Sequence, residues 1–128
     1  MIFKLGNRSL EILQKAHPEL QEVVKNAIVM TDVDFSVVET LRSREQQAEN
    51  IRNNVSWSMD SDHLANADGV SRAVDIYPWR NGATSHDPEH YKRIAKAMFA
   101  AAQLHGIGIE WGGFWKAEHE DCPHWNLL

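Results

Sequence analysis

Two histidines and two aspartates are the residues of this chain best suited to metal chemistry: His63, Asp75, Asp121 and His124. Imidazole nitrogens and carboxylate oxygens suit Zn²⁺, and a catalytic zinc has three protein ligands with a fourth position open to water. His63, Asp75 and His124 together would make such a set. Zinc held in this way polarises a carbonyl group and lowers the pKa of a water molecule towards ~7.

Asp75 stands out because it interrupts an apolar segment, RAVDIY, that is predicted to be a strand. Strand alternation places Asp75 with Ala73 and Tyr77 on one face, opposite to Val74 and Ile76. A carboxylate in such a place needs a partner. Hydrogen bonds are one explanation, and a metal or a catalytic role is the other.

Asp121 precedes His124 by three positions in the segment DCPHW, where Pro123 shapes a turn. A carboxylate this close to a ligand histidine can act on a water molecule as general base and then as general acid. An isolated D-x-x-H is usually a polar surface turn, and a lone loop histidine such as His63 is usually solvated. Each of these residues is therefore a candidate for metal chemistry only in combination with the others.

Other groupings of potential ligands fit metal chemistry less well. His119 begins H-E-x-x-x-H with His124, but the spacing differs from the zinc-binding H-E-x-x-H helix and Pro123 forbids that helix. His86 and His90 are four apart, yet His86 lies before the helix that is predicted to follow. The two side chains would not share a helix face.

Two helices are predicted near the N-terminus, within residues 9–30. Ser9 is predicted to cap the first and Pro18 to begin the second at its first position. The second helix has an apolar stripe at helical spacing, made of Leu20, Val23, Val24, Ala27 and Ile28. This stripe predicts a helix that packs against a core.

The rest of the chain mixes strands with helices. Strands are predicted at residues 34–41, at 72–77 with Pro78 ending the strand, at 107–111 and at the terminal HWNLL. A capping box predicts a helix from Arg44 to about Arg52, and a second helix is predicted from Asp87 and Pro88 to His105, ended by Gly106. Residues 53–71 form a long polar loop. Without regular βαβ alternation, the pattern predicts an α+β fold: a small, mainly antiparallel sheet with helices packed on one side.

Composition sets limits on class and partners. The 128 residues suit a single domain, here residues 1–128, and 43% hydrophobic residues suffice for a core. The net charge of -5 argues against nucleic acid as a partner. No apolar stretch is long enough to span a membrane, and MIFKLGNRSL has no signal-peptide core. The single cysteine, Cys122, excludes an internal disulfide, and we interpret it as a free cytosolic thiol.

The pattern S-x-H…G…A-x-D-x-x-P…W-G-G…D-x-P-H resembles that of the M15 zinc metallopeptidases. This family includes D-Ala-D-Ala dipeptidases and carboxypeptidases and the phage L-alanyl-D-glutamate endolysins, and the chain is most similar to the short endolysins. The matching segments are FKLGNRS, HPELQEVVKNA, LRSREQQAENI, SDH, GVSRAVDIYP, IEWGGFW and DCPHWNLL. The resemblance covers nearly the whole chain.

The resemblance implies a role for each site residue. The zinc ligands would be His63, Asp75 and His124, and Asp121 would be the catalytic acid and base. Arg42 matches an arginine that stabilises the oxyanion or binds substrate, a role that suits the fixed donors of a guanidinium. Without the resemblance, Arg42 would be read as half of a surface salt bridge. Ser61 matches a serine that contacts substrate.

The sequence departs from the family pattern at two places. His63 and Asp75 are farther apart than in the usual H-x-x-G-x-A-x-D, with LANADGVSR resembling an insertion between the ligands. Phe114 stands where the family usually has an acid in W-G-G-D-W.

The expected function is zinc-dependent hydrolysis of the L-Ala-D-Glu bond in peptidoglycan stem peptides, for host lysis. We expect a monomer that remains in the host cytoplasm until it is released to the cell wall, with no nucleic-acid or membrane partner. Two alternatives stay open: a D-Ala-D-Ala dipeptidase or carboxypeptidase, and a non-catalytic wall-binding module of the same fold. Asp121 favours catalysis, because an inert module has no reason to keep a carboxylate there.

Overall fold

The computed structural model describes residues 2–40 and 69–128. The α-helices in these residues are α1 (Asn7–Leu13), α2 (Pro18–Met30) and α4 (Pro88–His105). The strands are β1 (Phe35–Glu39), β2 (Ala73–Arg80), β3 (Ala83–Thr84), β4 (Ile109–Trp111) and β5 (His124–Leu127). Two 3₁₀ turns, η1 (Gly112–Phe114) and η2 (Ala117–His119), lie between β4 and β5. The predicted helix from Arg44 to Arg52 lies outside the described residues.

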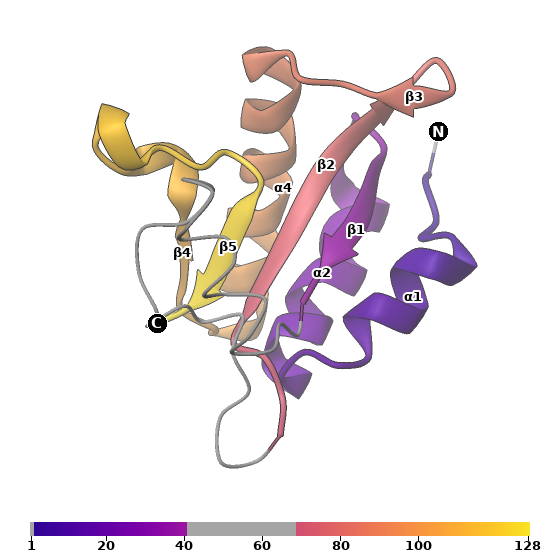
Figure 1. The fold of residues 1–128 in the computed structure, drawn as a ribbon. Helices are drawn as coiled ribbons and strands as arrows, with labels where there is room; N and C mark the ends of the chain where they lie inside the picture. Colours follow the sequence, from indigo (N-terminus) through magenta and orange to yellow (C-terminus); the bar gives the residue numbers. More distant parts are fainter. Residues whose placement is uncertain (1, 41–68) are drawn as a thin grey trace.

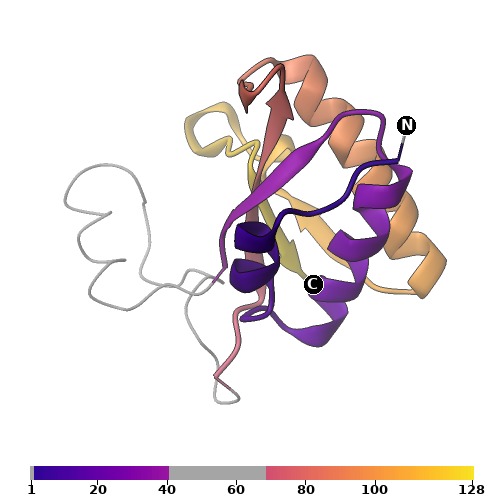
Figure 2. The ribbon, with the colours of Figure 1, turned by 90° about the vertical axis from the view of Figure 1, so that its right-hand side faces the viewer.

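The strands form one antiparallel sheet in the order β1-β2-β5-β4, and the short β3 pairs with the far end of β2. Helices α2 and α4 pack together behind this sheet, as Figure 1 shows. Seen from the side in Figure 2, both helices lie on the same side of the sheet. Helix α1 packs against β1. The expected α+β fold is confirmed.

Local signals in the sequence explain the ends of the two longer helices. Pro18 begins α2, and the side chain of His17 caps it by accepting from the amide of Glu19 at 3.1 Å. Asp87 caps α4 by accepting from the amide of Glu89 at 2.9 Å, and Gly106 ends α4 in the left-handed conformation at φ 66°. These features of α4 confirm the predicted helix.

The prediction for Ser9 is wrong. Helix α1 begins at Asn7 after Gly6, so Ser9 lies inside the helix and is buried. Its hydroxyl accepts a hydrogen bond from the amide of Val37 in β1, at 3.0 Å. The serine therefore joins α1 to the sheet, a long-range contact that a local capping rule does not detect.

Pro78 does not end β2, contrary to the prediction. The strand continues to Arg80, and Pro78 is paired with Phe35 of β1. The amide of Trp79 donates towards β1, to the carbonyl oxygen of Asp34 at 2.8 Å, whereas the amide of Ile76 donates towards the other side, to Pro123 at 2.9 Å. Alternation turns the nitrogen of Pro78 to this second side, beyond the start of β5. The missing N–H therefore removes no bond from the β1–β2 or β2–β5 ladders.

The core lies between the sheet and α2 with α4. All five residues of the predicted stripe on α2 are at most 4% exposed. They face the inward side chains of the sheet, which include Val37, Val74, Ile76, Trp125 and Leu127. The described helices include none with the length and apolar character that a membrane crossing requires.

Candidate metal centre

The pairing of β2 with β5 brings Asp75 and His124 together. The two residues are directly opposite each other in the antiparallel register, so their side chains lie on the same face of the sheet. The Oδ1 atom of Asp75 is 3.7 Å from Nδ1 of His124, and the two side chains are only 16% and 8% exposed. The expectation that Asp75 faces away from Val74 and Ile76 is confirmed by this register and by the burial of both aliphatic residues in the core.

Asp121 completes a group with Asp75 and His124. One potential ligand atom from each of the three residues lies within 4.8 Å of the other two. His124 is buried, and Asp121 is partly exposed. Within residues 2–40 and 69–128, these three are the His, Cys, Asp or Glu side chains that lie close enough together to share an ion. The structure thus unites three of the residues singled out by sequence.

Three other predicted site residues, Arg42, Ser61 and His63, lie outside the described residues. Their roles remain predictions. The competing pair His86 and His90 is engaged elsewhere: Nδ1 of His90 is 2.6 Å from the hydroxyl of Ser85, and the ring of His86 meets Tyr77 edge-on at a centroid distance of 5.9 Å. Neither histidine belongs to the Asp75–Asp121–His124 group.

The first glycine of the W-G-G motif, Gly112, explains how Asp121 approaches the sheet. The amide of Asp121 donates to the carbonyl oxygen of Gly112 at 3.0 Å, and the amide of His124 donates to the carbonyl oxygen of Asp121 at 3.1 Å. A Cβ atom on Gly112 would overlap the carbonyl oxygen of Asp121 and approach Cβ of His124 to 3.1 Å. Gly112 therefore permits a close approach that a larger residue would prevent.

The group lies in a negatively charged part of the sheet. Glu39 of β1 is the register partner of Asp75, after an irregularity in the pairing at Val37 and Glu39, so two acidic residues lie on adjacent strands. Burial, followed by the negative charges of Asp75, Asp121 and Glu39, raises the pKa of the nearby Tyr77 hydroxyl above its usual value. A cation bound among these carboxylates would offset their mutual repulsion.

The donor set fits a zinc ion. Carboxylate oxygens and an imidazole nitrogen are both zinc ligands, at about 2.0–2.2 Å from the metal. The 3.7 Å between Oδ1 of Asp75 and Nδ1 of His124 is a separation that two ligands of one ion can have. The structure is equally compatible with Asp121 as a ligand or as a base beside the ion, since its potential ligand atom belongs to the same 4.8 Å group.

Trp115 lies against the group. Its ring is tilted over the imidazole of His124 at a centroid distance of 4.8 Å, and its Nε1 donates to Oε1 of Glu110 at 2.8 Å. Trp111 and Trp125 stack in the core with their ring centroids 5.6 Å apart, and Trp111 also lines the groove described next.

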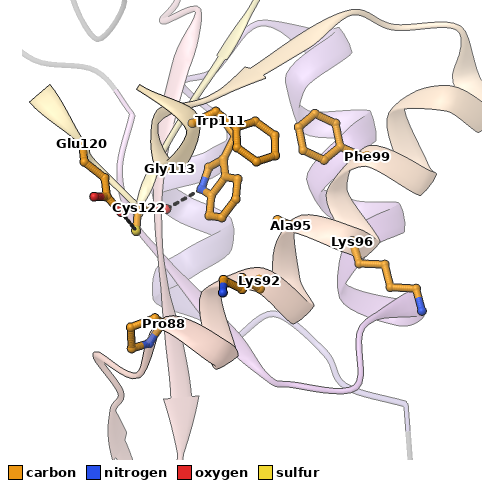
Figure 3. Close-up of a pocket in the computed structure, with 10 residues that line it drawn as sticks. Pro88, Lys92, Ala95, Lys96, Phe99, Trp111, Gly113, Glu120 and Cys122 are labelled. Atoms are coloured by element: carbon orange, nitrogen blue, oxygen red, sulfur yellow. Dashed lines mark hydrogen bonds between the residues drawn. The ribbon is translucent and has the colours of Figure 1, made fainter. Parts of the chain in front are cut away.

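A groove of about 530 Å³ lies between α4 and the part of the chain from Trp111 to Cys122. Figure 3 shows Glu120 and Cys122 on one side of this groove and Lys92, Ala95 and Lys96 of α4 on the other. Glu120 and Cys122 line the groove, whereas Asp121 between them belongs to the ligand group. The segment is held to β4 by Trp111, whose Nε1 donates to the carbonyl oxygen of Cys122 at 2.7 Å.

The thiol of Cys122 is a poor nucleophile. Its sulfur donates to Oε1 of Glu120 at 3.4 Å. Burial, then this hydrogen bond and the charge of Glu120, then the charge of Asp121, raise the pKa of the thiol to about 11. The reactive thiolate is therefore a minor species near neutral pH, in agreement with the interpretation of Cys122 as a free thiol without a catalytic role.

The fold and the group define a class: a small α+β protein with a candidate metal centre on the polar face of its sheet. Comparison with known proteins identifies the family. The model of the phage L-alanyl-D-glutamate peptidase family matches residues 1–124, and the chain belongs to that family.

Individual relatives agree with this assignment. The L-alanyl-D-glutamate peptidase of Escherichia phage T5 is 33% identical over 118 residues, which are 91% of this chain and 85% of the relative. The L-alanyl-D-glutamate peptidase of Listeria phage A118 is 33% identical over 72% of this chain but only 30% of its own length. The crystal structure of the L-Ala D-Glu endopeptidase ChiX of Serratia marcescens superposes with a TM-score of 0.87 at 37% identity, covering 98% of this chain and 90% of that one.

Proposed function

We propose that this protein is a zinc-dependent endolysin that hydrolyses the bond between L-Ala and D-Glu in the stem peptide of bacterial peptidoglycan. That it is a peptidase follows from its family, its named relatives and its structural neighbour. The observation that supports the chemistry is the Asp75–Asp121–His124 group, whose ligand atoms lie within 4.8 Å of one another. We further propose that residues 1–128 act as one catalytic domain.

The proposed ligands are His63, Asp75 and His124, and the proposed proton carrier is Asp121. A bound zinc would polarise the scissile carbonyl and increase the acidity of a water molecule. A carboxylate oxygen of Asp121 accepts the proton of the attacking water and then donates it to the departing amine. The C–O bond forms and the C–N bond breaks, leaving a carboxylate on L-Ala and a free amine on D-Glu.

The position of Asp121 on a turn, together with its partial exposure, supports this division of roles. His124 and Asp75 lie on paired strands of the sheet, where their positions are fixed, whereas Asp121 is on the turn that precedes β5. A ligand benefits from a fixed position, and a proton carrier must contact both the water and the leaving group. We also propose substrate roles for Arg42, which would stabilise the developing oxyanion, and for Ser61.

Analysis of digested peptidoglycan tests the proposal. Purified protein with one equivalent of zinc is incubated with purified peptidoglycan, and the fragments are identified by mass spectrometry and end-group labelling. New L-Ala carboxyl ends with matching D-Glu amine ends are the expected products. Released D-Ala would instead identify a dipeptidase or carboxypeptidase, and tight binding without new ends would identify a wall-binding module. Elemental analysis of wild type and His124→Ala tests the metal: equal zinc retention would exclude His124 as a ligand.

We propose that the protein acts in phage lysis as a monomer that reaches the wall from the host cytoplasm. The phage origin of the family and of two relatives supports the context. Added protein should then reduce the turbidity of cells only after their outer membrane has been permeabilised. Lysis of untreated cells at the same rate would contradict the need for a separate route to the wall.

A further inference from the structure

The two nitrogens of the His124 imidazole face different partners. Nδ1 is 3.7 Å from Oδ1 of Asp75, in the candidate metal centre. Nε2 is 2.8 Å from Oδ1 of Asn126, two residues along the same strand. His124 and Asn126 are each only 7% exposed, so this hydrogen bond is protected from competing water.

The amide group of Asn126 is oriented by the backbone. Its Nδ2 donates to the carbonyl oxygen of Leu127 at 3.1 Å, which turns Oδ1 towards His124. An amide oxygen only accepts hydrogen bonds, so Nε2 of His124 must carry the proton in this contact. In the neutral imidazole the lone pair then remains on Nδ1, the nitrogen that faces Asp75.

The sheet fixes the position of Asn126 on both sides. Strand β5 is an inner strand, and Asn126 is paired with Ala73 of β2 and with Glu110 of β4. The next amide, that of Leu127, donates to the carbonyl oxygen of Arg72 at 2.9 Å. The backbone is thus held between two neighbours, and the side chain is buried with both ends of its amide hydrogen-bonded, so it has little freedom to leave the imidazole.

We propose that Asn126 is a positioning residue that holds His124 in the tautomer protonated on Nε2, so that Nδ1 stays available as a metal ligand. The inference rests on the metal site of the proposed function. Histidine ligands commonly donate their second N–H to an acceptor that sets the tautomer and the ring orientation. Here a neutral amide supplies that acceptor, and it acts on the metal site through His124.

Zinc affinity of three full-length variants provides the test. Asn126→Leu removes the acceptor at similar size, and Asn126→Asp keeps an oxygen acceptor. Thr31→Val is the matched control: it removes a buried hydroxyl whose bonds to Val33 are 2.8 and 3.1 Å long, in the α2–β1 connection. Competition with a chromogenic chelator should show zinc binding weakened ~10–100-fold in Asn126→Leu and by less than about threefold in Asn126→Asp. Thr31→Val should lower the Tm and leave zinc affinity unchanged.

Nitrogen NMR of zinc-free protein with ¹⁵N-labelled histidine reads the tautomer directly. Wild type should show the His124 proton on Nε2, and Asn126→Leu should show a mixture of both tautomers. This readout separates positioning from a structural role, because a merely destabilised sheet lowers the Tm without changing the proton's place. If Asn126→Leu does not fold, Asn126→Ala takes its place. The wild-type spectrum still shows which nitrogen of His124 carries the proton.

Two results would overturn the proposal: a wild-type His124 protonated on Nδ1, or a folded Asn126→Leu variant with wild-type zinc affinity. Failure of the proposed function would look different. Wild-type protein that binds zinc but leaves peptidoglycan intact would contradict the endolysin activity, while the tautomer and the affinity series would still support the role of Asn126.

Discussion

The paired strands β2 and β5 present two faces of opposite chemistry. On the inner face Val74, Ile76, Trp125 and Leu127 pack against α2 and α4 and are at most 6% exposed. On the outer face the same strands present Asp75, His124 and Asn126. The inner face stabilises the fold by removing apolar surface from water. The outer face buries polar groups, which cost free energy unless they are paired.

The two faces of the same strands therefore have different roles: the inner face stabilises the fold, and the outer face has the side chains suited to chemistry. On the outer face Asp75 and His124 are held in place, since β2 and β5 are each paired with a strand on either side. The inner face supplies the packing that keeps those strands in register. We therefore expect substitutions on the inner face to change the free energy of unfolding, and substitutions at the outer face and its loop to change metal binding and turnover.

Asp121→Asn should give the largest effect. The amide cannot carry the proton between water and the leaving amine, so kcat for stem-peptide hydrolysis should fall ~10²–10⁴-fold, with zinc content and Tm retained. Glu118→Gln is the matched control, because Glu118 is an exposed acid in the same loop. Loss of zinc together with activity in Asp121→Asn would show instead that Asp121 is a required ligand.

Gly112→Ala should give the next largest effect. The added Cβ overlaps the carbonyl oxygen of Asp121, so the turn must move and carry Asp121 away from the group. A displacement of about 1 Å at a catalytic group can reduce turnover ~10²-fold. Gly6→Ala serves as the control because nothing lies within 4 Å of its added Cβ. Wild-type kcat in a folded Gly112→Ala protein would show that the approach of this loop is not needed.

Ile76→Val tests the inner face. Removing one buried methylene from a residue 1% exposed should lower the free energy of unfolding by about 0.5–1.5 kcal/mol. Urea denaturation measures this loss, and zinc affinity and kcat measured on the same sample should match wild type. A fall in kcat without a fall in stability would contradict the separation of the two faces, since Ile76 lies directly beside Asp75 in β2.

Cys122 should give the smallest effect on activity. Because its pKa is raised to about 11, the neutral thiol predominates at about pH 8, and alkylation by iodoacetamide should be slow there and accelerate with rising pH up to that value. Cys122→Ser should keep wild-type kcat. Rapid alkylation at about pH 8 that also abolished hydrolysis would contradict this prediction and indicate a catalytic thiol.

Much of this protein could be predicted from local sequence, because local signals have local physical causes. The cap at Asp87, the turn at Gly106 and the stripe on α2 depend on backbone groups and side chains within one or two helical turns. The polar face of β2 followed from strand alternation, with Asp75 as its anomaly. The family pattern also brought Asp121 and His124 to notice, although their roles remain predictions.

Other features were decided by the tertiary structure. The β2–β5 register sets Asp75 opposite His124. Asn126 is two residues from His124 on the same strand, but the structure was needed to show that its Oδ1 meets Nε2 of the imidazole. The turn at Asn81 and Gly82, with φ of 54° and 79°, was a local signal for the β2–β3 hairpin that the prediction missed. Ser9 and Pro78 were misassigned because their roles depend on β1 and on the point where β5 begins. Pairing between distant segments is chosen by packing over the whole sheet, and no short stretch of sequence contains that information.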